Sequence, residues 1–273
     1  MLGSSPFPAQ VFVDAWKGTQ RLKEDQEQIR SSSSTYLSPW HFLQLPAFSV
    51  VEQAPEHSGQ SGWNRFRFDE ACHLLGSLTL ITRDDLGFSV PPLVHDWARD
   101  HQSGDRKAQS WLVTGSILAL SSCESFLWQI NQVQLRPHIH SFVDVEVSAA
   151  FSRGPRDAIL GIFLQCGRML LHMRDDARLT SLLDQIFRES QADLANPLPA
   201  VLPFCQLHAS NLLNMGRREA GLTLLRRIVE LQETTLGRDH PDLLLSQHSR
   251  QSIPRSKSLL GGCPARRRGI VDQ

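Results

Sequence analysis

The sequence predicts a mainly α-helical protein, in which a small unit of helix and β-hairpin precedes a solenoid of helical hairpins. Two observations lead to this prediction. From Phe66 onward, apolar residues recur at helical spacing, interrupted once by two short extended runs. Later in the chain, Leu170 to Phe187 matches Leu212 to Val229 at a constant offset of 42 residues. A period in that range, with two helical faces per unit, is typical of stacked helical hairpins.

The composition is that of a globular protein without a global charge. Hydrophobic residues make up 41% of the 273 residues, which is enough to bury a core. The 28 basic and 28 acidic side chains cancel, so the overall charge favours neither a nucleic acid nor an anionic membrane as partner. The five cysteines form no C-x-x-C pair, and no signal peptide or membrane-spanning stretch is recognisable. We therefore expect a cytoplasmic protein with reduced thiols.

The two ends of the chain lack a sustained apolar pattern. Residues 1–64 contain one short polar helix candidate, Arg21 to Arg30, followed by segments rich in Ser, Pro and Gly. Residues 247–273 contain two prolines, a Gly-Gly pair and a basic run. Because too little apolar surface recurs on one face, we expect a poorly ordered N-terminal segment and a disordered tail.

Residues 65–105 are predicted to form a winged-helix-like unit. The helix would carry its apolar residues on one face, and the hairpin would pair Leu78 to Thr82 with Phe88 to Val90. The next helix would begin at Pro91 and Pro92, with Leu93, Val94 and Trp97 on one face. The helical face of the first helix comprises Phe68, Ala71, Cys72, Leu75 and Leu78. Between Arg65 and Arg99, four arginines and five acids argue against DNA binding and for packing within the chain.

Residues 106–246 are read as helices only, a helical linker followed by the repeating hairpins. The offset of 42 residues superposes two leucine pairs, a methionine and an isoleucine. The aligned pairs are Leu170 with Leu212, Leu171 with Leu213, Met173 with Met215, Leu182 with Leu224, Leu183 with Leu225 and Ile186 with Ile228.

The stretch from Asn214 to Ser246 resembles the kinesin-light-chain-like tetratricopeptide repeat. Units of that family carry a Gly before the second helix, an Ala within it, and an LG-x-x-HP-D/E junction to the next unit. The turn before the Ala is one residue shorter here than the usual spacing. The matching positions are Gly216, Ala220, Leu236, Gly237, His240, Pro241 and Asp242.

The region upstream looks like the winged-helix region of fungal-type NB-ARC tetratricopeptide proteins, which belong to the STAND switch ATPases. The segment Leu135 to Phe142, "LRPHIHSF", also resembles the family's link to the repeats. The resemblance runs from about Phe66 to Ser246. It implies an intracellular signalling or self/non-self recognition protein that responds to nucleotide.

The phosphate-binding loop of that family is missing from this sequence. No G-x-x-x-x-G-K-S/T occurs, and none of the four lysines follows a glycine. The nucleotide-sensing His of the family aligns with Pro91, and His95 is expected to be structural. We therefore expect no cofactor, no enzymatic activity, and a truncated relative that begins after the nucleotide-binding module and stops one turn into the next repeat.

Two other interpretations stay open at this stage. The chain is alternatively a regulatory fragment of a nucleotide-dependent switch ATPase that needs a missing N-terminal NTPase domain. The third interpretation is a gene remnant that folds poorly because its last hairpin has no capping helix.

Three groups of residues invite a chemical role, and each has a simpler interpretation. His240 lies between Asp239 and Asp242, but Gly237 and Pro241 explain that segment as the junction between two helices. His138 and His140 would share a face on a strand, but a metal site needs more ligands than these two. Neighbouring helical residues point in different directions, so Cys72 and His73 are disfavoured as a nucleophile pair. We predict no catalytic and no metal site.

The surface expected to bind a partner lies on the first helices of the hairpins. Polar side chains there would hold an extended peptide or a partner helix by hydrogen bonds. Ordinary solvated positions are an equally good interpretation, because helix phase is uncertain from sequence. The predicted function is a non-enzymatic protein-protein interaction module. The candidate partner-binding residues are Arg168, His172, Gln206, Ser210 and Asn214.

Overall fold

The computed structural model describes residues 5–28, 37–45, 65–85, 87–122, 132–192 and 197–235, and the account below is confined to them. The prediction of a mainly α fold is confirmed. The elements are α1 (Gln10–Gln28), α2 (Pro39–Leu43), α3 (Arg65–Ser77), β1 (Thr82–Asp84), β2 (Gly87–Ser89), α4 (Pro92–Asp100), α5 (Gly104–Ser121), α7 (Gln132–Val143), α8 (Val147–Phe151), α9 (Arg156–His172), α10 (Asp176–Glu189), the 3-10 helix η2 (Pro199–Val201), α11 (Leu202–Asn214) and α12 (Arg218–Thr235).

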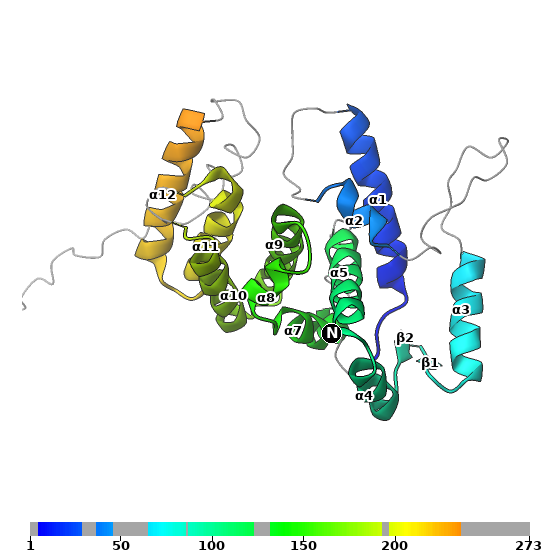
Figure 1. Ribbon diagram of the computed structural model, residues 1–273. Helices are drawn as coiled ribbons and strands as arrows, with labels where there is room; N and C mark the ends of the chain where they lie inside the picture. Colours follow the sequence, from blue (N-terminus) through cyan, green and yellow to red (C-terminus); the bar gives the residue numbers. More distant parts are fainter. Residues whose placement is uncertain are drawn as a thin grey trace, which may run out of the picture.

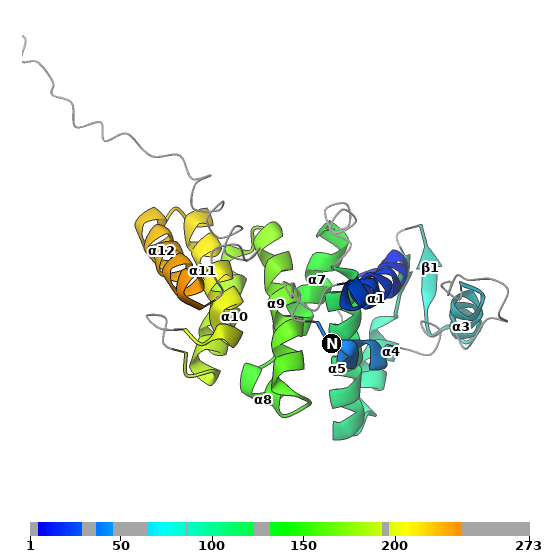
Figure 2. The ribbon, with the colours of Figure 1, turned by 90° about the horizontal axis from the view of Figure 1, so that it is seen from above.

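The helices stand in a row, with α3 at one edge of the molecule and α12 at the other (Figures 1 and 2). Helix α9 lies in the middle of the row and packs against α5, α7, α8, α10 and α11. Every residue from Ala158 to Gly167 is buried. A helix that is apolar and buried all round must be surrounded by other elements, so α9 forms the centre of the core.

The aromatic part of the core joins α5, α7 and α9. The indole of Trp111 stacks on the ring of Phe142 at 4.6 Å and packs against Phe163 at 5.7 Å. The indole N–H donates to the carbonyl oxygen of Phe142 at 3.4 Å, so the buried polar atom has a partner.

Helices α9 and α10 form one hairpin, and α11 and α12 form a second hairpin in the same register. Helix α9 ends at His172 and α11 at Asn214, and α10 begins at Asp176 and α12 at Arg218. Both pairs of positions are 42 residues apart. The offset found in the sequence therefore describes a repeated helical hairpin.

The two hairpin turns close with the same hydrogen bonds. In the first turn, the amides of Arg174 and Asp175 donate to the carbonyls of Leu171 and Leu170 at 3.1 and 3.0 Å. In the second, the equivalent bonds measure 3.0 and 2.8 Å. Arg174 and Gly216 occupy equivalent places and both have positive φ, 56° and 77°. A left-handed residue of this kind commonly ends a helix, and glycine adopts it without strain.

The N-terminal part corrects the prediction that residues 1–64 are poorly ordered. Residues 10–28 form α1, which packs along α5 and buries Val11, Ala15 and Leu22. The sequence pattern was missed because the buried stripe is sparse and also includes the polar residues Asp14 and Thr19. Of that segment, residues 1–4, 29–36 and 46–64 lie outside the described residues, and so does the predicted tail at 247–273.

Helix α2 is tied to α9 through one buried histidine. The side chain of His41 is fully buried. Its Nδ1 accepts from the amide of Ser38 at 2.9 Å, and its Nε2 donates to the carbonyl of Ala158 at 3.0 Å. This pattern requires a neutral imidazole with its proton on Nε2.

The helix, hairpin and helix predicted for residues 65–105 are present in that order. Strands β1 and β2 pair antiparallel with Arg83 opposite Phe88, so the first strand lies further along the chain than predicted. The reason is that the turn after α3, with Thr79 at φ 56°, occupies part of the expected strand. Phe7, which precedes α1, forms an isolated antiparallel bridge with Phe88 of β2.

The predicted apolar faces of α3 and α4 are largely uncovered. On α3, Phe68 is buried, whereas Leu75 is 39% exposed, and Leu78, just beyond the helix, is 57% exposed. On α4, Leu93 and Trp97 are 82% and 59% exposed. The periodicity of these helices was read correctly, but the inference that their apolar faces are buried within the described part of the chain was wrong.

Replacing Gly115 by Ala should destabilise the protein. A Cβ there would lie 2.6 Å from Cζ of Phe142 and 2.9 Å from Cγ2 of Ile162, and both neighbours are fully buried. Overpacking outweighs the gain in helix propensity, so the free energy of unfolding should fall by about 1–2 kcal/mol. The matched control is Gly76→Ala, where no atom lies within 4 Å, and that variant should be neutral or slightly stabilised. Urea unfolding measures both, and equal effects would contradict the packing described.

His41 predicts a loss of stability in mild acid. Burial lowers its pKa below the ordinary 6.5, so the unfolded chain binds the proton more readily than the folded chain does. The free energy of unfolding should therefore be constant near pH 8 and fall as the pH drops below about 6.5. His41→Gln keeps a donor and an acceptor but does not titrate. Its urea midpoint should fall less between pH 7 and pH 5.5 than that of the wild type. An identical fall would show that His41 does not contribute to the loss of stability in acid.

Candidate partner-binding groove

The five predicted partner-binding residues lie on two helices that pack against each other. Arg168 and His172 belong to α9, and Gln206, Ser210 and Asn214 belong to α11. His172 is exposed and the other four are half-buried. The Arg168 guanidinium donates to Oε1 of Gln165 at 3.4 Å. None of the five lines the groove described below.

The repeat motif residues are described only in part. Gly216 has the left-handed conformation expected of it. Ala220 is exposed, whereas the next residue, Gly221, is buried, and a Cβ on it would lie 2.9 Å from the side chain of Leu213. The small residue that lets α12 approach α11 is therefore Gly221, one place after the predicted Ala220. Leu236, Gly237, His240 and Pro241 lie outside the described residues.

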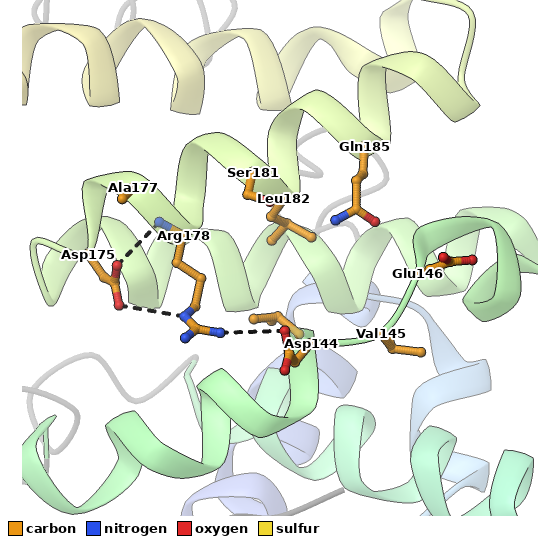
Figure 3. A pocket seen from close by; sticks show the side chains of 10 residues that line it. Asp144, Val145, Glu146, Asp175, Ala177, Arg178, Ser181, Leu182 and Gln185 are labelled. Atoms are coloured by element: carbon orange, nitrogen blue, oxygen red, sulfur yellow. Dashed lines mark hydrogen bonds and ion pairs between the residues drawn. The ribbon is translucent and has the colours of Figure 1, made fainter.

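A groove runs along the exposed side of α10. It consists of two adjoining hollows of about 450 and 610 Å³, which we call together the α10 groove. The two hollows share Glu146, Ala177, Ser181 and Gln185. One wall is α10, and the other is the connection from α7 to α8 and the start of α8 (Figure 3).

One end of the groove is held together by an acidic residue that caps α10. Asp175 is the N-cap, and its Oδ1 accepts from the amide of Arg178 at 3.3 Å. Its Oδ2 lies 2.7 Å from Nε2 of His140 and 3.9 Å from Nε of Arg178. The Arg178 side chain then reaches across the groove to within 3.8 Å of Asp144 (Figure 3). Because helix N-termini favour negative charge, Asp175 is suited to join α7 and α10.

In the middle of the groove, α10 is joined to α8 by a hydrogen bond. Oε1 of Gln185 accepts from the amide of Val147 at 3.3 Å, the first residue of α8. Leu182 and Val143 line the same hollow and are buried, so they form an apolar floor beneath polar walls.

The groove carries an excess of negative charge. Five carboxylates line it, against two guanidinium groups. Asp144 and Glu146 are exposed, and so is Asp184. An exposed acidic groove attracts cationic groups at a range of about 10 Å in ordinary salt. The acids are Asp144, Glu146, Asp175, Asp184 and Glu189, and the bases are Arg178 and Arg188.

The histidine pair is part of a helix, so the strand on which the two side chains would share a face is not formed. His138 and His140 lie on α7. His138 is buried and its Nε2 donates to the carbonyl of Pro6 at 3.1 Å. Burial lowers the pKa of His138, and burial together with the charge on Arg178 lowers the pKa of His140, against the opposing effect of Asp175. In the described part of the chain, no three His, Cys, Asp or Glu side chains are placed to hold a metal ion.

The described cysteines are not arranged as nucleophiles. Burial raises the pKa of the Cys166 thiol to about 12 and that of Cys205 to about 11. Cys72, on α3, is half-buried, and burial raises its pKa as well. All three thiols are protonated at neutral pH and are poor nucleophiles for that reason.

Comparison of the chain with family models, with curated proteins and with solved structures finds no match in any of the three. Within the described residues, the helices are too short or too polar to cross a membrane.

Sequence reasoning missed the groove because its walls come from separate parts of the chain. The connection "DVE" from Asp144 to Glu146 and the "DD" at the start of α10 are unremarkable when read apart. Two acids before a helix do predict an N-cap, and Asp175 could have been found in that way.

The charges of Asp175 and Arg178 act on the pKa of His140 in opposite directions, so removing each of them should shift that pKa in opposite directions. Asp175→Asn removes the negative charge beside His140 and should lower its pKa further. Arg178→Gln removes the positive charge and should raise it. NMR titration of the imidazole carbon-bound protons measures both shifts. His208 is the internal control: burial lowers its pKa, and the charges that act on it are those of Asp184 and Arg217, so its pKa should not move in either variant. Shifts of the same sign in the two variants would contradict the network.

Proposed function

We propose that this protein is a non-enzymatic interaction module and that its α10 groove binds an extended, basic segment of a partner protein. The observation that carries this proposal is the acidic groove itself, which is open along α10 and lined by more carboxylates than guanidinium groups. Rigid helices on one side and a short connection on the other present these groups in fixed positions.

The groove offers the two kinds of contact that an extended peptide uses. Ser181 and Gln185 supply hydrogen-bonding groups along the α10 wall, next to the apolar floor. Asp144 and Glu146 supply exposed carboxylates on the opposite wall. Arg178 stands 3.8 Å from Asp144, which is too long for a hydrogen bond, so Asp144 retains acceptor capacity for an incoming Lys or Arg.

We also propose that the two hairpins are tetratricopeptide-like repeats of a STAND-related protein, with a winged-helix-like unit before them. Support comes from the resemblance in the sequence, from the register of 42 residues and from the order helix, hairpin, helix, helical hairpins. In this proposal the repeats serve as the platform for the partner.

Charge reversal on the groove wall should abolish partner binding. The probe is a set of peptides selected from a random 12-residue phage library on the full chain. The selected peptides should carry net positive charge, and the double variant Asp144→Lys and Glu146→Lys should bind them at least about tenfold less tightly, a loss of about 1.4 kcal/mol. Fluorescence anisotropy measures the affinity.

Two control variants make this test specific. Asp105→Lys reverses an exposed acid in the first turn of α5, outside the groove, and should keep the affinity. Gln206→Ala with Asn214→Ala alters the first-helix surface that the sequence predicted. If the first-helix variant loses binding and the groove variant retains it, the partner surface lies on α9 and α11 instead. Selected peptides without positive charge would also contradict the proposal.

A further inference from the structure

The charge of this chain is divided unevenly along its length. Residues 247–273, which we call the basic tail, contain five arginines, one lysine and one aspartate. Six of the 28 basic and one of the 28 acidic side chains therefore lie in the tail, which leaves 22 basic and 27 acidic side chains for residues 1–246. A basic segment on an otherwise acidic chain is attracted to an acidic surface of that chain within its reach.

The other long segments outside the described residues do not offer a comparable charge. Residues 46–64 and 123–131 contain acidic side chains but no lysine or arginine. Residues 29–36 contain a single arginine, and residues 236–246 contain one arginine and two aspartates. Among these segments, the basic tail is the one whose charge complements the α10 groove.

The acids of the groove are placed to receive a run of arginines. Asp144 has 80% of its side chain exposed, and Glu146, two residues further along the same wall, is exposed as well. Asp184 is exposed on the α10 wall. The tail contains three consecutive arginines, residues 266–268. Successive side chains of an extended segment point to opposite sides, so such a run reaches both walls, and each guanidinium can bind a carboxylate through two N–H groups.

The tail also carries an apolar pair next to its arginines. Ile270 and Val271 follow the run after a single glycine. In the groove, Val145 is half-buried and Ala177 is exposed, so apolar surface remains accessible beside the acids. The tail and the groove thus match in both kinds of contact.

The length of the chain allows the tail to reach the groove. Helix α12 ends at Thr235 and packs against α11, which packs against α10 (Figures 1 and 2). Packed helices lie roughly 8–10 Å apart, so two such spacings separate α12 from the groove helix. About 30 residues lie between Thr235 and Arg266, and a chain of that length can span up to about 100 Å. Because the tail is linked to the groove, its effective concentration there is high.

We propose that the basic tail binds in the α10 groove of its own chain, with the arginines at 266–268 on the acidic walls, and that it competes there with the partner. The competition rests on the proposed function, because it requires a partner that uses the same groove. The contact between tail and groove does not require a partner and is tested without one.

A spin label on Cys263, three residues before the arginines, tests this contact in the full chain. Cys72→Ser and Cys123→Ser prevent labelling at those positions. Cys166 and Cys205 are buried and their pKa values are raised, so their thiols do not compete for the reagent.

The label should broaden the amide NMR signals of Val147 and Gln185, which lie at the groove, and should leave those of α3 and α4 sharp. The double variant Asp144→Lys and Glu146→Lys should lose this broadening, because like charges repel the tail. The matched control Asp105→Lys, outside the groove, should retain it.

A mixture distinguishes the tail of the same chain from that of a second copy. Spin-labelled chain without isotope enrichment is added to isotope-enriched chain without a label. The proposal expects no broadening in this mixture. It is overturned if broadening at the groove appears equally in the mixture, if the labelled chain shows none, or if the groove double variant keeps it.

Neutralising the arginines separates this inference from the proposed function. Arg266→Ser, Arg267→Ser and Arg268→Ser together should remove the broadening and should tighten the binding of the selected basic peptides at least about threefold, because the groove is then unoccupied. Equal affinity for wild type and triple variant would overturn the competition. If the label reaches the groove but no basic peptide is selected, the proposed function fails and the tail contact stands. If peptides bind in the groove and the label does not reach it, the tail contact alone fails.

Discussion

The burial of α9 is the constraint on which the rest of the structure depends. Every residue from Ala158 to Gly167 is shielded from water, and five other helices provide the shield. Because α9 is also the first helix of a hairpin, its position fixes α10, and α10 forms one wall of the acidic groove. Helix α5 also packs against α9, and α1 packs against α5. The N-terminal residues are thereby joined to the same core.

Polar contacts between neighbouring helices supplement this apolar packing. The guanidinium of Arg136, on α7, donates to the carbonyl of Met173 just after α9, and that of Arg174 donates to the carbonyl of Asn214 at the end of α11. Both arginines therefore satisfy carbonyls that a helix end leaves without a partner. The amide of Asn211 similarly donates to Thr180 Oγ1 at 2.8 Å, between the hairpins. Such bonds prevent neighbouring helices from sliding along each other. The walls of the α10 groove therefore keep their relative position.

The sequence was informative where a pattern repeats within one helix or between equal helices. The leucine pairs at an offset of 42 residues located both hairpins, and Pro91 with Pro92 located the start of α4. It was less informative where partners are distant in the chain. The buried face of α1 can be recognised only from its packing against α5. His41 is held by a hydrogen bond to Ala158, which is 117 residues away in the chain. The walls of the groove come from residues 143–148 and 175–189, so no local sequence motif predicts the groove.

Native-state hydrogen exchange of the full chain tests the central role of α9 most directly. The amides of residues 161–170 should exchange most slowly and only through global unfolding, with the same free energy as urea unfolding gives. Those of α3 and α4, whose apolar faces are exposed, should exchange through smaller openings. Exchange of α9 through a local opening, while α11 and α12 stay protected, would contradict the account.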